Sequence, residues 1–311
     1  MKYLITGGAG FIGSNIAHTL LDKGETVRIL DNFSTGRRIN LADIEDKIEI
    51  IDGDISDFWT VKDAVEGIDY VLHQAALPSV PRSVSNPLTS NKVNIDGTLN
   101  LLEAGKRAGV KRFVMASSSS VYGDTPELPK HEQMPTDPLS PYAVTKLTCE
   151  KYCKVFYNLY GLETVCLRYF NIFGPRQDPN SEYAAVIPKF IFALSSGKQP
   201  VVFGDGEQSR DFTYIDNTIQ ANLLAVTSKI APGNFYNVAC GARFTLNDLL
   251  DMLREIIGTN IKAKYIAPRP GDILHSYADV SRAKKDLGYN PRVMFKEGLK
   301  KTVEWFTSDH S

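Results

Sequence analysis

A tyrosine and a lysine one helical turn apart, Tyr142 and Lys146, follow a hydroxyl cluster at Ser118, Ser119 and Ser120. Residues i and i+4 are neighbours on one helix face, with about 5–6 Å between their Cβ atoms. Poising a tyrosine of pKa about 10 as a base near neutral pH takes about 4 kcal/mol of phenolate stabilisation. An ammonium about 4 Å away, at an effective dielectric of about 20, supplies that much. The pair can therefore do general-base chemistry if it faces a substrate; otherwise this spacing describes a solvated helix.

The elements that would position this pair begin with a glycine-rich turn. Residues 3–5 predict a strand, Gly7, Gly10 and Gly13 a tight turn, and residues 14–23 a helix. The missing side chains let a pyrophosphate approach the backbone and set the helix N-terminus toward the anion. A glycine motif alone is weak evidence, so the elements that follow decide its meaning.

A second strand, residues 27–30, ends at Asp31, about twenty residues beyond the glycine turn. A carboxylate at this place accepts hydrogen bonds from both adenosine ribose hydroxyls and repels a 2′-phosphate. The sequence therefore favours NAD over NADP. Arg37 and Arg38 follow and could serve a phosphate, but a role as solvated loop charges is the favoured interpretation.

Further strands are predicted at residues 48–51, 70–76 and 112–116, with an amphipathic helix over 91–108. This alternation predicts an α/β fold, a doubly wound parallel sheet of the Rossmann type that binds ligands beyond the carboxyl ends of its strands. Asp54 follows the third strand. Two interpretations are equally supported: its carboxylate accepts a hydrogen bond from the adenine amino group, or it belongs to an exposed acidic turn. His73 closes the fourth strand, where a hydrogen-bonded structural role is favoured over catalysis.

The length of 311 residues predicts two domains. We expect a Rossmann domain over 1–170, with some later segments crossing back, and a smaller C-terminal α/β substrate domain over 171–311. Lys plus Arg is 35 and Asp plus Glu is 36, so no bulk charge favours nucleic acid or an anionic membrane as partner. The four cysteines form neither a disulfide framework nor a paired zinc motif, and no metal is expected.

Neither a signal peptide nor a transmembrane segment is predicted, because the glycine turn begins at Gly7 and no apolar run approaches about 20 residues. A cytoplasmic location is expected. In the second half, a helix is predicted over 184–194, interrupted early by Pro188, and a hairpin turn at Asp205 and Gly206. Arg210 suits a phosphate, although a surface ion pair is the alternative.

Five motifs together resemble the extended short-chain dehydrogenase/reductase family, and within it the nucleotide-sugar 4-epimerases that act on UDP-glucose or UDP-N-acetylglucosamine. They lie at residues 6–13, 31–36, 118–123, 142–146 and 167–175. The resemblance implies that Tyr142 takes the proton of the sugar 4-hydroxyl while C4 gives hydride to NAD. It also implies that Ser118 shares the hydrogen bond and that Lys146 holds the nicotinamide ribose. The 4-keto sugar would swing about its diphosphate and be reduced on its other face.

The resemblance also implies two sets of binding residues. NAD would be bound by Gly7, Gly10, Phe11, Ile12, Gly13, Asp31, Asn32, Ser34, Gly36, Asp54, Ile55, Gln74, Ala75, Ala76, Asn94, Ala116, Tyr142, Lys146 and Tyr169. The UDP-sugar would be bound by Ser79, Ser118, Tyr142, Asn171, Val186, Val201, Phe203, Arg210, Arg269, Asp272 and Ser276. Arg210 and Arg269 would meet phosphate, and Asp272 the uridine ribose.

Relatives on the same scaffold that remove water or carbon dioxide differ in the hydroxyl cluster. Sugar 4,6-dehydratases carry an Asp-Glu pair after its first residue, and UDP-glucuronate decarboxylases carry a Glu before Val-Tyr-Gly. This chain has Ser119 and Ser120 there, so the carboxyl acid/base for elimination is missing and a 4-epimerase is favoured. A small residue at Ser276 resembles enzymes that accept N-acetylhexosamines as well as glucose and galactose.

The sequence thus predicts a UDP-hexose 4-epimerase, active on UDP-GlcNAc/UDP-GalNAc and on UDP-glucose/UDP-galactose. The alternatives are an NAD-dependent nucleotide-sugar dehydrogenase or reductase, and a non-catalytic NAD-binding regulatory protein. Family members pair through two helices of the nucleotide domain, which implies a homodimer. Many members carry a lysine after the fourth strand that contacts the pyrophosphate, and Pro78 occupies that place here.

Overall fold

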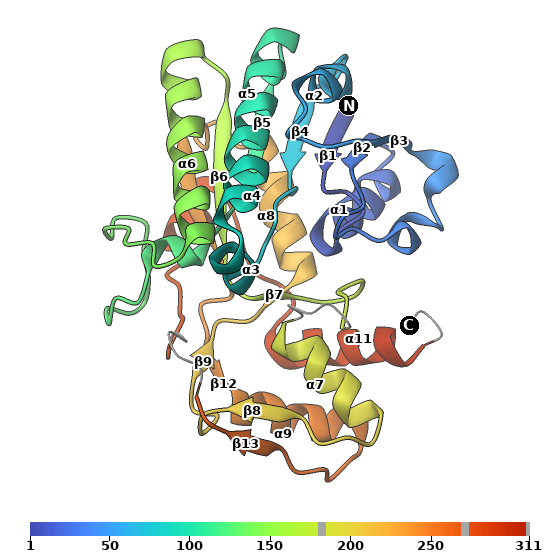
Figure 1. Ribbon diagram of the computed structural model, residues 1–311, viewed down its shortest axis with the longest axis vertical. Helices are drawn as coiled ribbons and strands as arrows, with labels where there is room; N and C mark the ends of the chain where they lie inside the picture. The colour runs from blue at the N-terminus through green and yellow to red at the C-terminus, as the bar shows by residue number, and fades with distance from the viewer. Residues whose placement is uncertain (180–184, 269–273, 309–311) are drawn as a thin grey trace.

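Parallel strands form the seven-stranded central sheet, in the order β11-β6-β5-β4-β1-β2-β3 (Figure 1). The structure is a computed structural model that describes residues 1–179, 185–268 and 274–308. The strands are β1 (Lys2–Thr6), β2 (Thr26–Asp31), β3 (Glu49–Asp52), β4 (Tyr70–His73), β5 (Arg112–Ser118), β6 (Thr164–Tyr169) and β11 (Asn234–Val238). The predicted α/β fold with a doubly wound parallel sheet is confirmed.

Helices cover both faces of this sheet. Successive strand residues point to opposite sides, and the strands carry apolar residues on both, so each face needs a layer of helices to bury it. On one face, Leu4 and its equivalents pack with α2 (Phe58–Val65), α5 (Gly97–Ala108) and α6 (Pro141–Tyr160). On the other face, Tyr3 and Ile5 and their equivalents pack with α1 (Phe11–Asp22) and α8 (Ile215–Thr227). Shorter helices precede α5: α3 (Val80–Ser85), α4 (Pro87–Asn91) and the π-helical turn η3 (Lys92–Asp96). The helix predicted over 91–108 is therefore divided at Gly97.

Helix α6 has well-defined ends, which matters because it carries Tyr142 and Lys146. The Ser140 side chain accepts a hydrogen bond from the Ala143 N–H at 3.2 Å, and Pro141 occupies the first turn. Both features stabilise a helix start. Gly161 ends the helix in the left-handed conformation.

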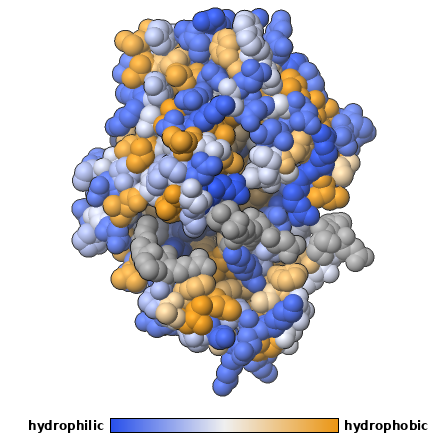
Figure 2. All heavy atoms as spheres, viewed as in Figure 1, coloured by the Kyte–Doolittle hydropathy of each residue, from blue (hydrophilic) through white to orange (hydrophobic). Residues whose placement is uncertain are grey.

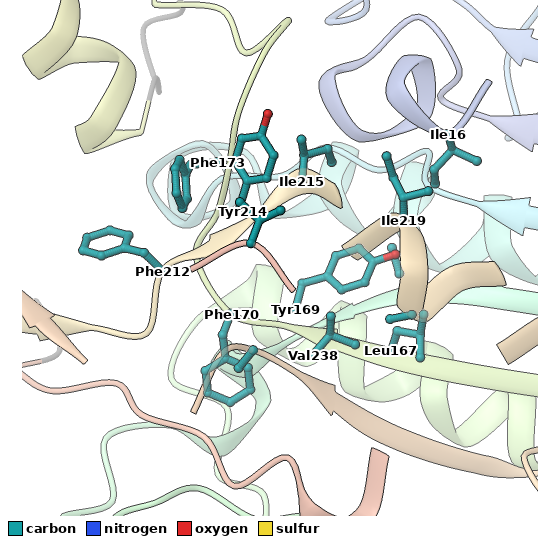
Figure 3. Close-up of a cluster of buried hydrophobic side chains, with 14 of the residues drawn as sticks. Ile16, Leu167, Tyr169, Phe170, Phe173, Phe212, Tyr214, Ile215, Ile219 and Val238 are labelled. Carbon is teal, nitrogen blue, oxygen red and sulfur yellow. The ribbon is translucent and has the colours of Figure 1, made fainter. Parts of the chain in front are cut away.

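The lower part of the molecule in Figure 1 comes from the second half of the chain. Its elements are β7 (Ile172–Phe173), α7 (Val186–Ser195), β8 (Val201–Phe203), β9 (Ser209–Arg210), β10 (Thr213–Tyr214), β12 (Phe244–Thr245), α9 (Leu246–Ile257), β13 (Lys264–Ile266) and α11 (Phe295–Thr307). Helix α10 (Ser281–Leu287) packs instead against β11 and α8. A continuous hydrophobic cluster joins the lower part to the sheet: Phe173 and Tyr214 lie toward one end of it in Figure 3, and Leu167 and Ile219 toward the other. Strand β11 comes from the second half of the chain yet pairs with β6. The domain boundary at residue 170 stays a prediction.

Two local predictions in the second half are wrong. Pro188 does not interrupt a helix: α7 begins at Val186, so the proline lies in the first turn, where its missing N–H has no intrahelical acceptor. Asp205 and Gly206 do not join a hairpin, because β8 pairs with β13 and β9 pairs with β12. Long-range pairing overrides the local turn signal in this segment.

The surface is mixed in character. Figure 2 shows apolar and hydrophilic side chains interspersed over the visible face. Within the described part of the chain, no helix is long and apolar enough to cross a membrane. The same residues contain no group of three or more His, Cys, Asp or Glu side chains placed to hold a metal ion.

Gly13 is predicted to be essential for seating α1. A Cβ there would lie 2.2 Å from the Gly7 carbonyl oxygen, so Gly13→Ala should lower stability by about 1–3 kcal/mol or more. In the matched control, Gly105→Ala in α5, the new Cβ meets only Val110 at 3.6 Å, and stability should rise by up to about 1 kcal/mol. Thermal unfolding measures both; equal midpoints would show that the close approach at Gly13 is tolerated.

Candidate active site

A cavity of about 730 Å³ opens at the carboxyl ends of β1 and β4. The chain leaves β1 toward β2 and β3 and leaves β4 toward β5 and β6, so the strand order reverses between these two neighbours. Ligands of doubly wound sheets bind at such a switch point. Of the residues expected to bind NAD, all except Asn94 line this cavity, and Ser118 and Asn171 line it as well.

The glycine turn at the cavity floor fits a pyrophosphate. Gly7 has φ 68°, and a Cβ there would lie 2.7 Å from the Ala75 nitrogen at the end of β4. Helix α1 starts after Gly10 without a side-chain cap and has no acidic residue in its first turn. Its first N–H groups can therefore receive an anion. This cradle fits the diphosphate of a dinucleotide such as NAD.

Asp31, which the sequence predicts to bind the adenosine ribose, lines the cavity at the end of β2. Its carboxylate accepts hydrogen bonds from the Ala9 N–H at 2.9 Å and the Phe33 N–H at 2.8 Å. Burial raises the pKa of Asp31, and these two hydrogen bonds act in the opposite direction. A Cβ at Gly36 would lie 2.9 Å from both carboxylate oxygens, so a glycine keeps that side open. Asp54 lies nearby and accepts from the Ser56 N–H at 2.7 Å.

The two arginines that follow Asp31 have carboxylate partners. Arg38 donates to Asp52 at 2.7 Å and lies 3.9 Å from the centre of the Phe33 ring. Arg37 lies 3.8 Å from Asp178. Both partners agree with a role as loop charges, although Arg37 also lines the cavity.

The tyrosine, lysine and serine come together on the wall opposite the glycine turn. Lys146 is buried, and its Nζ donates to the Ala116 carbonyl at 2.7 Å and lies 6.0 Å from the centre of the Tyr142 ring. Ser118 Oγ accepts from the Ser120 hydroxyl at 2.9 Å. The Tyr142 N–H donates to Ser83 Oγ of α3 at 3.0 Å, which ties the start of α6 to that helix.

The electrostatics of this group differ from the expectation. Burial raises the pKa of Tyr142 to about 12, and a hydrogen bond with Ser118 acts in the opposite direction without compensating. Burial likewise lowers the pKa of Lys146. The expected lowering of the phenol pKa by the ammonium is therefore not produced by the chain alone: burial dominates the pKa of Tyr142, and the Lys146 ammonium is directed to the Ala116 carbonyl.

His73 and Asn94 support the site from behind the cavity wall. The His73 ring lies between Thr6 Oγ1 at 2.7 Å and Thr98 Oγ1 at 2.9 Å, and burial lowers its pKa to about 3. A neutral, hydrogen-bonded ring agrees with the structural interpretation. Asn94 accepts from the Leu77 N–H at 2.8 Å and donates to Thr145 Oγ1 at 3.1 Å, so it joins the loop after β4 to α6.

A second cavity of about 660 Å³ adjoins the first, and Asn171, Ile172 and Ala185 line both. The predicted substrate residues Val186, Val201, Phe203 and Arg210 line this second cavity. Arg210 donates to the Ser209 carbonyl at 2.9 Å and to the Leu274 carbonyl at 3.1 Å.

Four predicted substrate residues are not among the described residues that line either cavity. Arg269 and Asp272 lie outside the described residues. Ser79 instead caps α3, where its hydroxyl accepts from the Arg82 N–H at 3.1 Å. Ser276 lies beside β9, and its N–H donates to the Ser209 carbonyl at 3.0 Å.

The sequence predicted neither Arg176 nor Asp211. Arg176 lines the first cavity with φ 68° and donates to Asn15 Oδ1 of α1 at 3.1 Å. Asp211 lies between the second-cavity residues Arg210 and Phe212 in the chain; it is fully buried and accepts from the N–H groups of Cys240 at 2.9 Å and Gly241 at 3.0 Å. Burial raises its pKa to about 7 despite these bonds. In the sequence, the position of Asp211 directly after Arg210 could have pointed to this residue.

Comparison with known proteins identifies related chains over the full length. The model of the family described as "NAD dependent epimerase/dehydratase family" matches residues 3–239. A putative UDP-glucose 4-epimerase of Methanocaldococcus jannaschii is 40% identical, with 99% of each chain covered. The structure of a UDP-N-acetylglucosamine 4-epimerase from Methanobrevibacter ruminantium M1 in complex with UDP-N-acetylmuramic acid is 45% identical, with a TM-score of 0.94 over 99% of this chain and 98% of that one. The structure of a Thermus thermophilus UDP-glucose 4-epimerase complex with NAD is 36% identical, with a TM-score of 0.91 over 99% of this chain and all (100%) of that one.

The raised pKa of Asp211 predicts a pH dependence of stability. Between its unfolded pKa of 3.8 and its folded pKa of about 7, the folded chain holds the extra proton, so this group's contribution to stability falls as pH rises through that window. Each unit of difference amounts to about 1.4 kcal/mol. Asp211→Asn should therefore lose less stability than the wild type between pH 4 and 7 in denaturant unfolding. Parallel curves for the two proteins would contradict the assignment.

Proposed function

The chain belongs to the NAD dependent epimerase/dehydratase family, and on that premise we propose that it is a UDP-hexose 4-epimerase. Its cofactor is NAD. The proposed substrates are the pairs UDP-GlcNAc/UDP-GalNAc and UDP-glucose/UDP-galactose. A homodimer and a division of the chain near residue 170 remain part of the proposal.

The observation that carries this proposal is the composition of the group around Tyr142. Ser118, Tyr142 and Lys146 line one cavity, and the two positions after Ser118 are Ser119 and Ser120. Proton transfer at a sugar hydroxyl needs only such hydroxyl groups. Elimination of water across C5 and C6 needs a further acid and base, for which carboxyl groups are suited.

The carboxylates that do line the first cavity, among the described residues, are committed elsewhere. Asp31 and Asp54 accept from backbone N–H groups at the adenosine end, and Asp178 lies 3.8 Å from Arg37. No hydrogen bond between these three and Ser118 or Tyr142 occurs in the described part of the chain. This favours epimerisation over dehydration within the family.

In the proposed mechanism the chain positions the sugar and moves one proton. Bound NAD, held by residues of the first cavity such as Gly7, Asp31 and Lys146, would supply a reversible hydride acceptor for C4 and a positive charge that lowers the pKa of a nearby phenol. Tyr142 takes the proton of the 4-hydroxyl and later returns it, while Ser118 hydrogen-bonds the same oxygen. Lys146 adds a second positive charge near the phenol, and Arg210 holds the diphosphate about which the sugar turns.

The second cavity supports a uridine diphosphate as the fixed part of the substrate. Phe203 offers a face on which a base can pack, and Arg210 offers paired donors for phosphate oxygens. The second cavity adjoins the first at Asn171 and Ala185, and Tyr142 lines the first. A sugar that extends from a diphosphate at Arg210 through this junction would approach Tyr142.

Two other functions would give different results when the protein is incubated with a UDP-sugar and NAD. A dehydrogenase or reductase would release a keto product and consume added cofactor in proportion to substrate. A non-catalytic regulatory protein would bind NAD and UDP-sugar without turnover. The presence of Ser118, Tyr142 and Lys146 in one cavity disfavours the second alternative, because binding alone needs no base.

The first test is conversion of UDP-N-acetylglucosamine by the protein with NAD and no added reductant. UDP-N-acetylgalactosamine should accumulate to an equilibrium mixture. Tyr142→Phe should lower kcat by about 10²–10⁴-fold, since it removes the proton-transfer group and keeps the ring. Tyr157→Phe, on the same helix, serves as the control and should behave as the wild type. No conversion of either hexose pair would overturn the epimerase proposal, and an active Tyr142→Phe would remove Tyr142 as the base.

A second test concerns the sugar 2-substituent. If a small residue at position 276 admits the acetamido group, Ser276→Tyr should lower kcat/KM for UDP-GlcNAc by at least about tenfold, within the range that steric discrimination supplies. UDP-glucose measured on the same variant is the internal control and should change little. An equal loss on both substrates would refute this role for Ser276.

A further inference from the structure

Three residues that we propose to contact the UDP-sugar come from separate segments of the chain. Asn171 follows β6, Arg210 ends β9, and Ser276 lies beside β9 near the C-terminal part of the chain. The binding site works only if these segments keep fixed positions relative to one another. The residue that all three segments share is Asp211.

Backbone and side-chain atoms of Asp211 make these links. Its carbonyl accepts from Asn171 Nδ2 at 3.3 Å. Arg210 precedes it in the chain, so the placement of one backbone fixes the other. Its Oδ2 accepts from the Ala278 N–H at 3.4 Å, two residues beyond Ser276. Ser276 in turn donates to the Ser209 carbonyl at 3.0 Å.

The carboxylate also holds the turn that follows β11. Oδ1 accepts from the Cys240 N–H at 2.9 Å, and Oδ2 accepts from the Gly241 N–H at 3.0 Å. Both oxygens are thus used by backbone donors. An asparagine in this place offers one oxygen and directs an NH₂ group at backbone donors, so it cannot replace the carboxylate.

Asp211 is fully buried, so water does not solvate its carboxylate. A buried carboxylate is unfavourable unless its hydrogen bonds are needed. Phe212, which follows it, lines the second cavity together with Arg210, so the segment continues as cavity wall. The bonds of Asp211 therefore lie directly behind the proposed diphosphate site.

We propose that Asp211 is a positioning residue for the UDP-sugar, which fixes Arg210, Asn171 and the segment of Ser276 in one arrangement. The inference rests on the proposed function for the identity of the ligand. It assigns Asp211 no contact with the substrate and no part in the chemistry. A change of the Asp211 side chain should therefore alter the affinity for the uridine diphosphate half. Asn171, which lines both cavities, is held by the main-chain carbonyl of Asp211, and a side-chain change keeps that bond and with it the NAD cavity.

The test compares Asp211→Asn with a matched control, Glu132→Gln. Glu132 is also buried, its pKa is also raised by burial, and it accepts from the Asn237 N–H at 2.8 Å. Calorimetric titration with UDP should give a Kd at least about tenfold higher for Asp211→Asn, and a Kd close to that of the wild type for Glu132→Gln. NAD should bind all three proteins alike. Unchanged UDP affinity in a folded Asp211→Asn, or an equal loss in both variants, would overturn the proposal.

A measurement on the wild type keeps the proposal falsifiable if Asp211→Asn does not fold. Hydrogen exchange at the amides of Gly241 and Ala278 should slow by about tenfold when UDP binds, because the ligand immobilises the segment that carries Asp211. The amide of Asn237, held by Glu132, should not change. Unaltered exchange at all three amides in UDP-saturated protein would contradict the proposal.

The two proposals fail in different ways. UDP affinity is measured without turnover, so a protein that binds UDP through this arrangement and yet converts no sugar would refute the epimerase proposal alone. A protein that converts sugars normally after Asp211→Asn, with unchanged KM, would refute the positioning role alone.

Discussion

The registration of α6 against the end of β5 is the constraint on which the proposed chemistry depends. Lys146 donates to the Ala116 carbonyl at 2.7 Å, and the Ser117 hydroxyl donates to Glu150 at 2.5 Å. Arg168 of β6 completes this set with two bonds to Glu150, at 2.8 and 2.7 Å. Removal of one partner from a buried ion pair typically costs about 3–5 kcal/mol, so this register is held firmly. The position of Tyr142 is thus set both by Lys146 and Ala116, which line the cavity, and by the buried pair of Glu150 and Arg168, which lies outside its lining.

The two cavities are built by different physical means. The cofactor side uses close backbone approach, as at Gly7 and Gly13, where a side chain would collide with neighbouring main-chain atoms. The second cavity is lined by side chains from distant segments, and Asp211, next to Arg210 in the chain, accepts hydrogen bonds from Asn171 and Ala278. A fixed cofactor site beside a site assembled from separate segments suits a family whose members share NAD and differ in sugar chemistry.

Local sequence signals were sufficient for the nucleotide half. The glycine spacing, the strand that ends at Asp31 and the pair at Tyr142 and Lys146 each follow from a short window with a clear physical meaning. Strand pairing and hydrogen bonds between residues far apart in the sequence could not be predicted from such short windows. Pairing of β8 with β13 overrode the turn signal at Gly206, and the hydrogen bonds of Asp211 join residues far apart in sequence. The direction in which the Tyr142 pKa shifts depends on burial, which residue spacing does not indicate.

In the proposed reaction, bonds are made and broken only at C4 of the sugar and its hydroxyl group. The most direct measurement uses UDP-glucose deuterated at C4, incubated in normal water with the protein and NAD, and a parallel sample of unlabelled substrate in heavy water. For a 4-epimerase, we expect UDP-galactose to keep the deuterium at C4 and no solvent deuterium to enter C5. Loss of the C4 label, or deuterium at C5 in the heavy-water sample, would contradict it.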